Sequence, residues 1–297
     1  MAEGSAMAEE PPAPEALAAA FPPGFREQVR HRFARGATHY EQEARLQRAV
    51  AWRLARLCRD LPLEPGPRAD LGAGTGLLSR ALLQQWPNGP EPPPLEPRLQ
   101  QLDLCPDLLA RNPLASPAER QGWDLHRGLP PAAQNAALLA SSFALQWLED
   151  PAGQLGRWCG ALAPGGWLAV AVPTAGSFPQ WHAAAAAAAV PCTALPLPAA
   201  EPLIAAATAA GLQLRHRKRL HFSRPVAGGA EALRRLQRLG AGASPSPPLS
   251  APQLRRLLRH WSEPRLSWEV LLLVGQRPRV GVSAGRNCAE SHPPALP

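Results

Sequence analysis

A glycine-rich loop, Asp70-Leu71-Gly72-Ala73-Gly74-Thr75-Gly76, is the feature that most restricts the fold of this sequence. It joins the short apolar run Arg68–Leu71 to an amphipathic stretch that begins at Leu77. Glycines allow the backbone to take positive φ values and to approach a ligand closely. A dinucleotide-binding fingerprint would have another glycine at position 77, and a phosphate-binding loop would have a lysine directly after its last glycine. The loop therefore favours a ligand other than a pyrophosphate or triphosphate, or a tight strand-to-helix turn that binds nothing.

Short apolar runs alternate with amphipathic stretches along most of the chain. Strands are expected at 68–71, 98–104, 135–143 and 167–172, and helices at 77–86, 105–111 and 151–162. Such alternation predicts an α/β, doubly wound parallel sheet with helices on both faces. Two later strand candidates, 212–222 and 268–274, lack the short βαβ spacing, so we expect an antiparallel last strand. Helical patterns over 28–61 and 183–189, and two arginine-rich helices after residue 222, complete the prediction.

The composition predicts one ordered domain, at residues 25–278. Residues 1–24 are rich in alanine, proline and glutamate, and together with residues 279–297 they predict disordered tails. Many of the 37 prolines crowd into short segments, and the one at 87–97 predicts a surface loop.

Cysteine usage and hydropathy exclude other classes of protein. The five cysteines are widely spaced and form no CxxC pair, which argues against a disulfide framework or a structural zinc. No apolar run approaches the roughly 20 residues needed to cross a bilayer, and no signal peptide is visible. We therefore expect a cytoplasmic protein without a metal site.

Acidic residues lie at or directly after the ends of three expected strands. Asp70 lies at the end of the first strand and Asp103 at the end of the second, where a carboxylate can accept both ribose hydroxyls of an adenosine. Asp124, in Gly122-Trp123-Asp124-Leu125, would follow a further strand between the runs at 98–104 and 135–143, where it could meet an adenine amino group. Each could instead cap a helix. The distance from Gly76 to Asp103 exceeds the usual ~20 residues, and the segment at 87–97 would absorb the surplus.

Four stretches outside the loop carry a resemblance to a known family. They are Phe33-Ala34-Arg35-Gly36-Ala37-Thr38-His39-Tyr40-Glu41 with Leu46-Gln47, Ser141-Ser142-Phe143-Ala144-Leu145-Gln146-Trp147, Gly176-Ser177-Phe178-Pro179, and Leu236-Gln237-Arg238-Leu239-Gly240-Ala241. With the glycine loop, they make the chain from about Val29 to Gln276 resemble the class I S-adenosylmethionine-dependent methyltransferases. More narrowly, it resembles the malonyl-acyl-carrier-protein O-methyltransferases of biotin synthesis. Ser142 stands where that family usually has asparagine, and Gln237 where it usually has lysine.

The resemblance implies a Rossmann-like class I methyltransferase sheet, S-adenosyl-L-methionine as cofactor, and malonyl-acyl carrier protein or malonyl-CoA as substrate. An insertion at about 174–262 would lie on the substrate side. Tyr40 would be catalytic, over the methionine end of the cofactor, and Gln146 and Trp147 would border the substrate. The cofactor-binding residues would be Asp70, Gly72, Ala73, Gly74, Gly76, Asp103, Leu104, Asp124, Leu125 and Ser141. Tyr40 and Trp147 could instead have packing roles only.

The formal net charge of +8 comes almost entirely from arginine. The densest basic stretch is 215–219, followed by Arg234, Arg235 and Arg238. A solvated face is one interpretation. Under the resemblance, these residues would face the acidic carrier protein. An RNA methyltransferase would also exploit the charge, but the sequence has no Asn-Pro-Pro-Tyr-type motif.

Other functions remain open from the sequence. A methyltransferase of a quinone or another small metabolite would share the cofactor site, and a non-catalytic relative would have lost it. We expect a monomer that binds neither nucleic acid nor membrane.

Overall fold

The computed structural model describes residues 21–86 and 99–279. The expected tails at 1–24 and 279–297 lie almost wholly outside the described residues, and so does the expected loop at 87–97. The described chain forms a seven-stranded sheet in the order β3-β2-β1-β4-β5-β7-β6. The strands are β1 (Arg68–Leu71), β2 (Leu99–Asp103), β3 (Arg120–Gly122), β4 (Ala136–Ser142), β5 (Leu162–Pro173), β6 (Gln213–Pro225) and β7 (Arg265–Gln276).

The direction of the strands confirms the predicted fold class. Strands β1 to β5 pair in parallel, whereas β7 is antiparallel to both of its neighbours, β5 and β6. The sheet is therefore mostly parallel with an antiparallel last strand, as the alternation of the sequence indicates.

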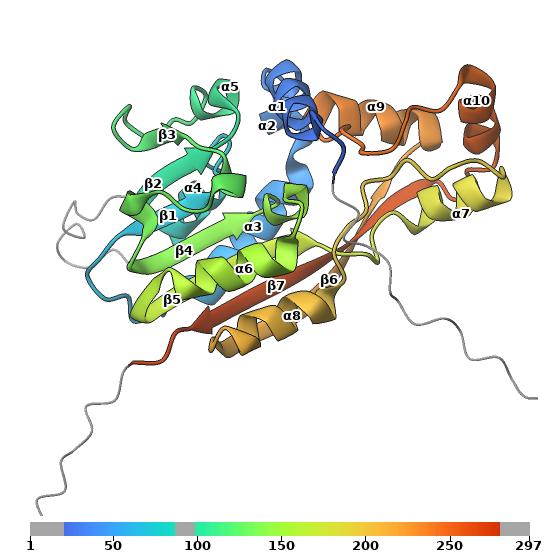
Figure 1. Ribbon diagram of the computed structural model, residues 1–297. Helices are drawn as coiled ribbons and strands as arrows, with labels where there is room; N and C mark the ends of the chain where they lie inside the picture. The colour runs from blue at the N-terminus through green and yellow to red at the C-terminus, as the bar shows by residue number, and fades with distance from the viewer. Residues whose placement is uncertain (1–20, 87–98, 280–297) are drawn as a thin grey trace, which may run out of the picture.

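Helices cover both faces of this sheet (Figure 1). The helices of the described chain are α1 (Phe25–Gly36), α2 (Tyr40–Glu43), α3 (Arg45–Cys58), α4 (Leu77–Gln85), α5 (Pro106–Leu109), α6 (Pro151–Gly160), α7 (Pro179–Ala187), α8 (Ala200–Ala209), α9 (Gly229–Leu239) and α10 (Ala251–Arg259). On one face α6 and α8 pack together, and on the other α3 and α4 do. Strand β4 serves both cores, because Leu139 packs with the first pair of helices and Leu138 with the second.

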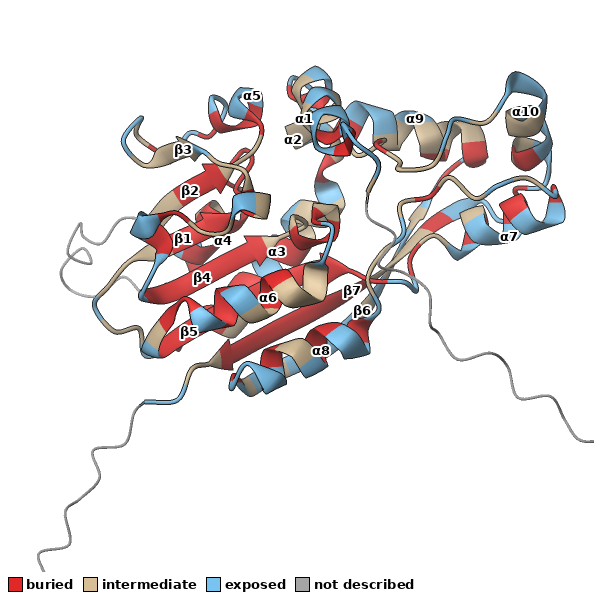
Figure 2. Ribbon diagram, in the orientation of Figure 1, coloured by how far each residue is buried: buried red, intermediate tan, exposed pale blue. Residues whose placement is uncertain are grey.

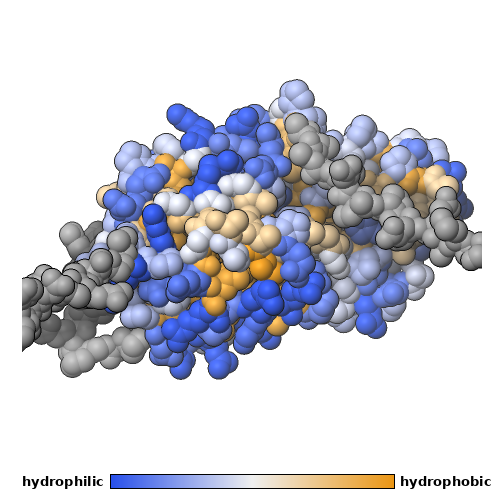
Figure 3. Space-filling view, turned by 60° about the horizontal axis from the view of Figure 1, so that its bottom comes forward, coloured by the Kyte–Doolittle hydropathy of each residue, from blue (hydrophilic) through white to orange (hydrophobic). Residues whose placement is uncertain are grey.

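The burial of each residue follows this layered arrangement. Figure 2 shows buried residues along the central strands and exposed residues on the outer sides of the helices. Seen from below, the face of the molecule is mainly hydrophilic, with hydrophobic residues gathered near its centre (Figure 3). No helix in the described ranges is long and apolar enough to span a bilayer.

The predicted helical pattern over 28–61 is wrong as a single element, because it is divided among α1, α2 and α3. The breaks fall after Gly36 and at Ala44, whose ψ of 38° departs from the helical value. Apolar spacing continues across the breaks, so periodicity alone could not locate them. Tyr40 begins α2 after this interruption, and it lies at the carboxyl ends of the strands.

Other elements also differ from the prediction. Helix α8 was not predicted, because Pro202 falls in a proline-rich stretch, yet a proline in the first helical turn loses no intrahelical hydrogen bond. Strand β5 begins at Leu162, so Pro164-Gly165-Gly166 lies in an irregular part of the strand rather than in a turn before it. Helix α5 is shorter than the expected 105–111.

The region from 174 to 262 does not form a single insertion. Helix α8 and strand β6 complete the sheet, whereas α7, α9 and α10 lie beyond the end of β5 together with α1 (Figure 1). Two glycines of the family-like motifs hold α1 against α9. A Cβ on Gly36 would lie 2.8 Å from the Arg238 carbonyl oxygen, and one on Gly240 would lie 2.7 Å from the Phe33 Cα. The backbones could not approach this closely with larger residues.

Candidate functional site

The glycine loop connects β1 to α4 and bends over the end of β2. Gly72, Gly74 and Gly76 have φ values of 76°, 53° and 79°. The backbone N–H groups of Gly72 and Ala73 both donate to the Leu102 carbonyl oxygen, at 2.8 and 2.9 Å. The loop is thereby fixed to the second strand, at the carboxyl edge where ligands bind in open α/β sheets.

The three glycines of the loop have different roles. A Cβ on Gly72 would overlap the Ala144 side chain, and a Cβ on Gly76 would overlap the buried side chain of Asn112. A Cβ on Gly74 would meet no atom closer than 3.8 Å. Packing therefore requires the first and third glycines, whereas Gly74 borders open space that a ligand can fill.

Asp103 faces this open space from the end of β2, as predicted. Its Oδ2 accepts from the Gly74 N–H at 2.8 Å, and its Oδ1 accepts from the Cys105 N–H at 2.7 Å. Burial raises the pKa of Asp103 to about 6, even though both backbone hydrogen bonds favour the charged form. The carboxylate is thus held in one orientation beside the glycine loop.

Asp70 lies beneath the loop and does not line the cavity. It is 1% exposed, and its Oδ2 accepts from the Ser79 hydroxyl at 2.6 Å. Burial, with a smaller contribution from the charge of Asp103, raises the pKa of Asp70 to about 7. Asp70 therefore ties α4 to β1 and supports the loop from below.

Asp124 follows β3, the neighbour of β2 in the sheet, and is in contact with α1. Its Oδ2 accepts from Arg26 Nη1 at 3.1 Å, and its Oδ1 accepts from the His126 N–H at 3.0 Å. Partial burial would raise the pKa of Asp124, but hydrogen bonds from His126 and Arg26 hold it below its usual value. Neither Arg26 nor His126 was predicted as a site residue. The contact of His126 is local, whereas that of Arg26, 98 positions from Asp124, depends on how the chain folds.

Glu41 links the segment after α1 to the glycine loop through a hydrogen bond. Its Oε1 accepts from the Thr75 hydroxyl and from Arg80 Nη2, each at 2.5 Å, and its Oε2 pairs with Arg48 at 3.1 Å. Burial opposes the charged form, yet these partners lower the pKa of Glu41. Glu41 belongs to a family-like motif but was not predicted as a site residue.

Tyr40, the neighbour of Glu41, projects into the same cavity. Its ring lies 6.3 Å from that of Phe33, in an edge-to-face arrangement. Burial, followed by the negative charge of Asp103, raises the pKa of Tyr40 far above its usual value. The phenol is therefore protonated at neutral pH, and it can donate a hydrogen bond but cannot serve as a base.

These side chains surround a small cavity of about 90 Å³. The predicted residues that line it are Tyr40, Gly72, Gly74, Asp103, Leu104, Asp124, Leu125 and Trp147. Asp70, Ala73, Gly76 and Ser141 do not line it. The Ser141 hydroxyl donates to the Leu71 carbonyl oxygen at 2.8 Å, inside the sheet. The next residue, Ser142, lines the cavity instead.

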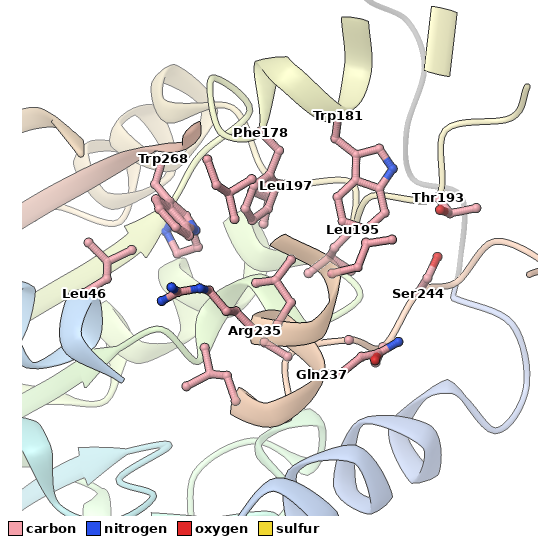
Figure 4. Close-up of a pocket in the computed structure, with 18 of the residues that line it drawn as sticks. Leu46, Phe178, Trp181, Thr193, Leu195, Leu197, Arg235, Gln237, Ser244 and Trp268 are labelled. Carbon is pink, nitrogen blue, oxygen red and sulfur yellow. The ribbon is translucent and has the colours of Figure 1, made fainter. Parts of the chain in front are cut away.

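A larger cavity of about 630 Å³ adjoins the first. Phe143 and Trp147 line both, so the two cavities meet at these aromatic rings. Gln146 borders the larger one, and its Nε2 donates to the Phe143 carbonyl oxygen at 2.8 Å. Most of the wall consists of apolar and aromatic side chains from α7, α9 and β7 and from the segment that follows α7 (Figure 4).

The arginines predicted to share one face do not lie together. Arg235 lines the larger cavity, whereas Arg234 and Arg238 are exposed on the outside of α9. The basic stretch 215–219 lies on β6, the edge strand, where the alternation of a strand directs its side chains to opposite sides. Within the described residues no group of three or more histidine, cysteine or acidic side chains could hold a metal ion.

The strand order, the antiparallel β7 and the glycine loop give this chain the fold of the class I methyltransferases. Solved structures agree. The Haloferax volcanii complex of the Trm112 methyltransferase activator and its partner methyltransferase aligns with a TM-score of 0.51 at 18% identity, over 86% of this chain and 99% of that one. A phosphoethanolamine N-methyltransferase of Haemonchus contortus, solved with S-adenosylhomocysteine, aligns with a TM-score of 0.50 at 15% identity, over 86% of this chain and 60% of that one.

Curated relatives confirm the narrower resemblance to the methyltransferases of biotin synthesis. The biotin biosynthesis bifunctional protein BioCD of Bordetella avium is 33% identical over 240 residues, which are 78% of this chain and 48% of that protein. A malonyl-[acyl-carrier protein] O-methyltransferase of Magnetococcus marinus is 32% identical over 49% of this chain and 53% of its own length.

A second kind of relative has a different named substrate. The trans-aconitate 2-methyltransferase of Streptomyces avermitilis is 34% identical over 38% of this chain and 41% of its own length. The chain thus spans about half the length of the curated relatives it matches. No family model matches the sequence.

Proposed function

We propose that this chain is an S-adenosyl-L-methionine-dependent methyltransferase whose cofactor binds in the cavity beside the glycine loop. The observation that carries the proposal is the space at Gly74, where a Cβ would have no atom closer than 3.8 Å, next to the fixed carboxylate of Asp103. Asp103 would accept the ribose hydroxyls, and Asp124 would meet the adenine amino group once Arg26 moves aside. When bound, the cofactor supplies a methyl group on a positively charged sulfur.

Unpaired polar atoms in the cavity support this assignment. The Ser142 hydroxyl and His126 Nε2 are both buried, and neither has a hydrogen-bond partner among the described residues. Buried polar atoms in folded proteins nearly always have a partner. A bound molecule with polar groups along the cavity would supply one, and adenosine with a methionine chain has such groups.

We propose a carboxylate as the methyl acceptor. The names of the relatives support it, because malonyl-acyl carrier protein and trans-aconitate are both carboxylic acids. A carboxylate has a pKa near ~4 and is already ionised at neutral pH, so its methylation needs no general base. The protonated Tyr40 is consistent with such a reaction.

Catalysis would then depend on position. Holding a carboxylate oxygen in line with the methyl group can supply as much as ~7–11 kcal/mol of the barrier. Phe143 and Trp147 lie where the two cavities meet, so the acceptor would approach the methyl group between them. We propose malonyl-acyl carrier protein, or malonyl-CoA, as the acceptor and biotin biosynthesis as the pathway, in the cytoplasm and as a monomer. The second candidate is a small free carboxylic acid.

The direct test is an assay of the purified protein with S-adenosylmethionine and malonyl-acyl carrier protein, followed by mass analysis of the product. We expect a gain of one methyl group as an ester that alkali removes. trans-Aconitate is assayed in parallel, and a methyl ester formed only on it would favour the second candidate. If neither acid is methylated while the cofactor binds, the proposed acceptor is wrong.

Replacement of Tyr40 by phenylalanine is expected to lower kcat/KM about tenfold. The change removes a single hydroxyl from the cofactor cavity and leaves the ring packed against Phe33. Affinity for S-adenosylhomocysteine, measured by calorimetry, should change less than threefold, because Asp103 and the loop are untouched. Wild-type kcat/KM in this variant would show that Tyr40 has a packing role only.

The variant Arg234→Glu is expected to impair turnover of the carrier-bound substrate only. The Arg234 side chain is exposed on α9, so its reversal should repel an acidic protein, whereas Arg238 is left unchanged because it lies 3.9 Å from Glu43, which lines the larger cavity. We expect KM for malonyl-acyl carrier protein to rise about tenfold at low salt, and less at high salt. Malonyl-CoA has no carrier protein, so its kinetics are the control. An equal effect on both substrates, or none on either, would reject this docking face.

A further inference from the structure

The larger cavity combines apolar walls with an excess of positive charge. Four arginines line it, Arg32, Arg45, Arg224 and Arg235, against one acidic residue, Glu43. Aromatic rings of Phe178, Trp181 and Trp268 form much of the opposite wall (Figure 4). A guanidinium in an apolar cavity is suited to a carboxylate, because it can donate two parallel hydrogen bonds to it.

We infer that Arg235 binds the reacting carboxylate of the substrate inside this cavity. The inference rests on the proposed function and names the residue that would hold the acceptor. Arg235 lies on the side of α9 that faces the cavity, and its guanidinium is directed toward Leu46 and Trp268 (Figure 4). Leu46 and Trp268 pack on the same core cluster as Phe143, the residue that borders both cavities.

The Arg235 side chain is held in place before any substrate binds. Its Nε donates to Glu231 Oε1 at 2.7 Å, and its Nη2 pairs with the same oxygen. Glu231 is itself fixed, because its Oε2 accepts from the Ala227 N–H at 2.6 Å. Only one edge of the guanidinium is engaged in this way. The edge that carries Nη1 remains for a carboxylate.

The other arginines of the cavity are less suited to this role. Arg224 makes one long ion pair, 3.8 Å from its Nη1 to Glu43, so its orientation is fixed less firmly than that of Arg235. Arg45 is exposed at the rim. Arg32 lies on α1 where that helix packs against Gly240, at the end of α9 rather than in its middle. Arg235 is therefore the cation that combines a fixed orientation with a place in the wall of the larger cavity.

The chemistry predicts which kinetic constant Arg235 controls. A carboxylate oxygen forms a bond to the methyl carbon, the carbon–sulfur bond breaks, and its electron pair remains on sulfur. No proton moves, and the anionic carboxylate becomes a neutral ester. The contact with Arg235 is thus strongest with the substrate and weakens as the ester forms. An interaction of this kind lowers KM and does not raise kcat, and it allows the product to leave.

The test compares the affinities for a carboxylate and for its ester. Malonyl-CoA and its methyl ester are titrated by calorimetry in the presence of S-adenosylhomocysteine, with wild type and Arg235→Met. We expect wild type to bind the acid roughly ten- to a hundredfold more tightly than the ester. Arg235→Met should bind both with the affinity of the ester. In turnover, its KM should rise by a similar factor and its kcat should change little.

Three further variants separate this role from a structural one. Arg235→Lys keeps the charge and should recover part of the preference for the acid. The double variant Glu231→Gln, Arg235→Met removes the unpaired Glu231 charge and should still bind acid and ester alike. Arg255→Met, which removes an exposed arginine of α10 outside the cavity, should behave as wild type. Unchanged affinity for S-adenosylhomocysteine shows that each variant is folded.

The possible failures are distinguishable. If wild type methylates malonyl thioesters and Arg235→Met prefers the acid as strongly as wild type does, the assignment of Arg235 is overturned while the proposed function stands. The assignment is also overturned if the double variant regains the preference. If wild type binds S-adenosylhomocysteine but no carboxylic acid, the assignment of Arg235 and the proposed carboxylate acceptor are both overturned.

Discussion

Replacement of Gly74 by valine is expected to lower affinity for S-adenosylhomocysteine at least a hundredfold. Gly74 has a φ of 53° and lies against open space, where a Cβ would meet only Leu108 at 3.8 Å and Asp103 at 3.9 Å. The branched side chain would occupy the volume that the proposed cofactor requires. It would also disturb the Gly74 N–H, whose hydrogen bond to Asp103 is part of the proposed cofactor site.

Backbone strain must be separated from this blocking effect. A β-branched residue at positive φ is expected to reduce stability by on the order of 1–3 kcal/mol wherever it is placed. Gly211 has a φ of 81° with nothing near its Cβ position, and it lies after α8 outside the linings of both cavities. Gly211→Val is therefore a matched control that should lose similar stability and keep its affinity. Equal loss of affinity in both variants, or in neither, would contradict the proposed cofactor site.

Replacement of Asp103 by alanine is expected to weaken binding of S-adenosylhomocysteine roughly ten- to a hundredfold. The change removes the acceptor of the ribose hydroxyls, and hydrogen bonds to charged groups are worth about 1.5–3 kcal/mol. Asp70→Ala is an informative comparison, because Asp70 supports the loop without lining the cavity. Calorimetry at pH 8 measures both. Wild-type affinity in Asp103→Ala would show that the adenosine does not bind at β2.

The raised pKa of Asp103 predicts a dependence on pH with a definite sign. The ionised carboxylate accepts the hydroxyls, and its pKa is about 6, so affinity should fall as the pH is lowered through 6. Affinity at pH 5 should be roughly a tenth of that at pH 8, if only the ionised form binds. The same titration in Asp103→Ala should be nearly flat. An equally steep dependence in the variant would assign the titration to another group.

Stability should respond to pH in the opposite direction. Asp103 and Asp70 have pKa values of about 6 and about 7 in the folded chain, both above the ordinary value. A group whose pKa is raised by folding contributes stability at low pH, and the contribution is lost as the pH rises through the folded value. These two carboxylates therefore favour the fold on acidification from pH 8 to pH 5, over the range in which cofactor affinity should decrease.

Local sequence patterns were sufficient to predict the framework of the site. Strands β1 and β4 are short apolar runs bounded by turn residues, and the glycine loop follows the first of them. Because parallel strands end at one edge of a sheet, Asp103 and Asp124 could be placed near the loop. The structure brings both acids to the same cavity.

Features that depend on packing between distant segments could not be predicted in this way. The ion pair between Arg26 and Asp124 joins residues 98 positions apart, and the bond from Thr75 to Glu41 joins α2 to the loop. Neither pair has a local signal. The break in the helical pattern before Tyr40 also has no local signal in the sequence, because apolar residues continue at helical spacing on both sides.

Two site residues could have been predicted from the direction in which their side chains point from the strand or helix. In β4, side chains alternate between the faces, and the hydroxyl of Ser141 is bonded within the sheet while Ser142 reaches the cavity. In α9, Arg235 lies beside the face that carries Ala232 and Leu239, which are buried, and Arg234 does not. The positions of the arginines around the helix axis would therefore have distinguished Arg235 from the other arginines.

A crystal structure of the protein with bound S-adenosylhomocysteine tests the central claim most directly. We expect the adenosine between Asp103 and Asp124, with Asp103 accepting both ribose hydroxyls, Arg26 displaced and the amino-acid chain passing Gly74 toward Phe143 and Trp147. Density for the ligand at any other place, with the Arg26–Asp124 ion pair intact and the cavity beside Gly74 empty, would contradict the account.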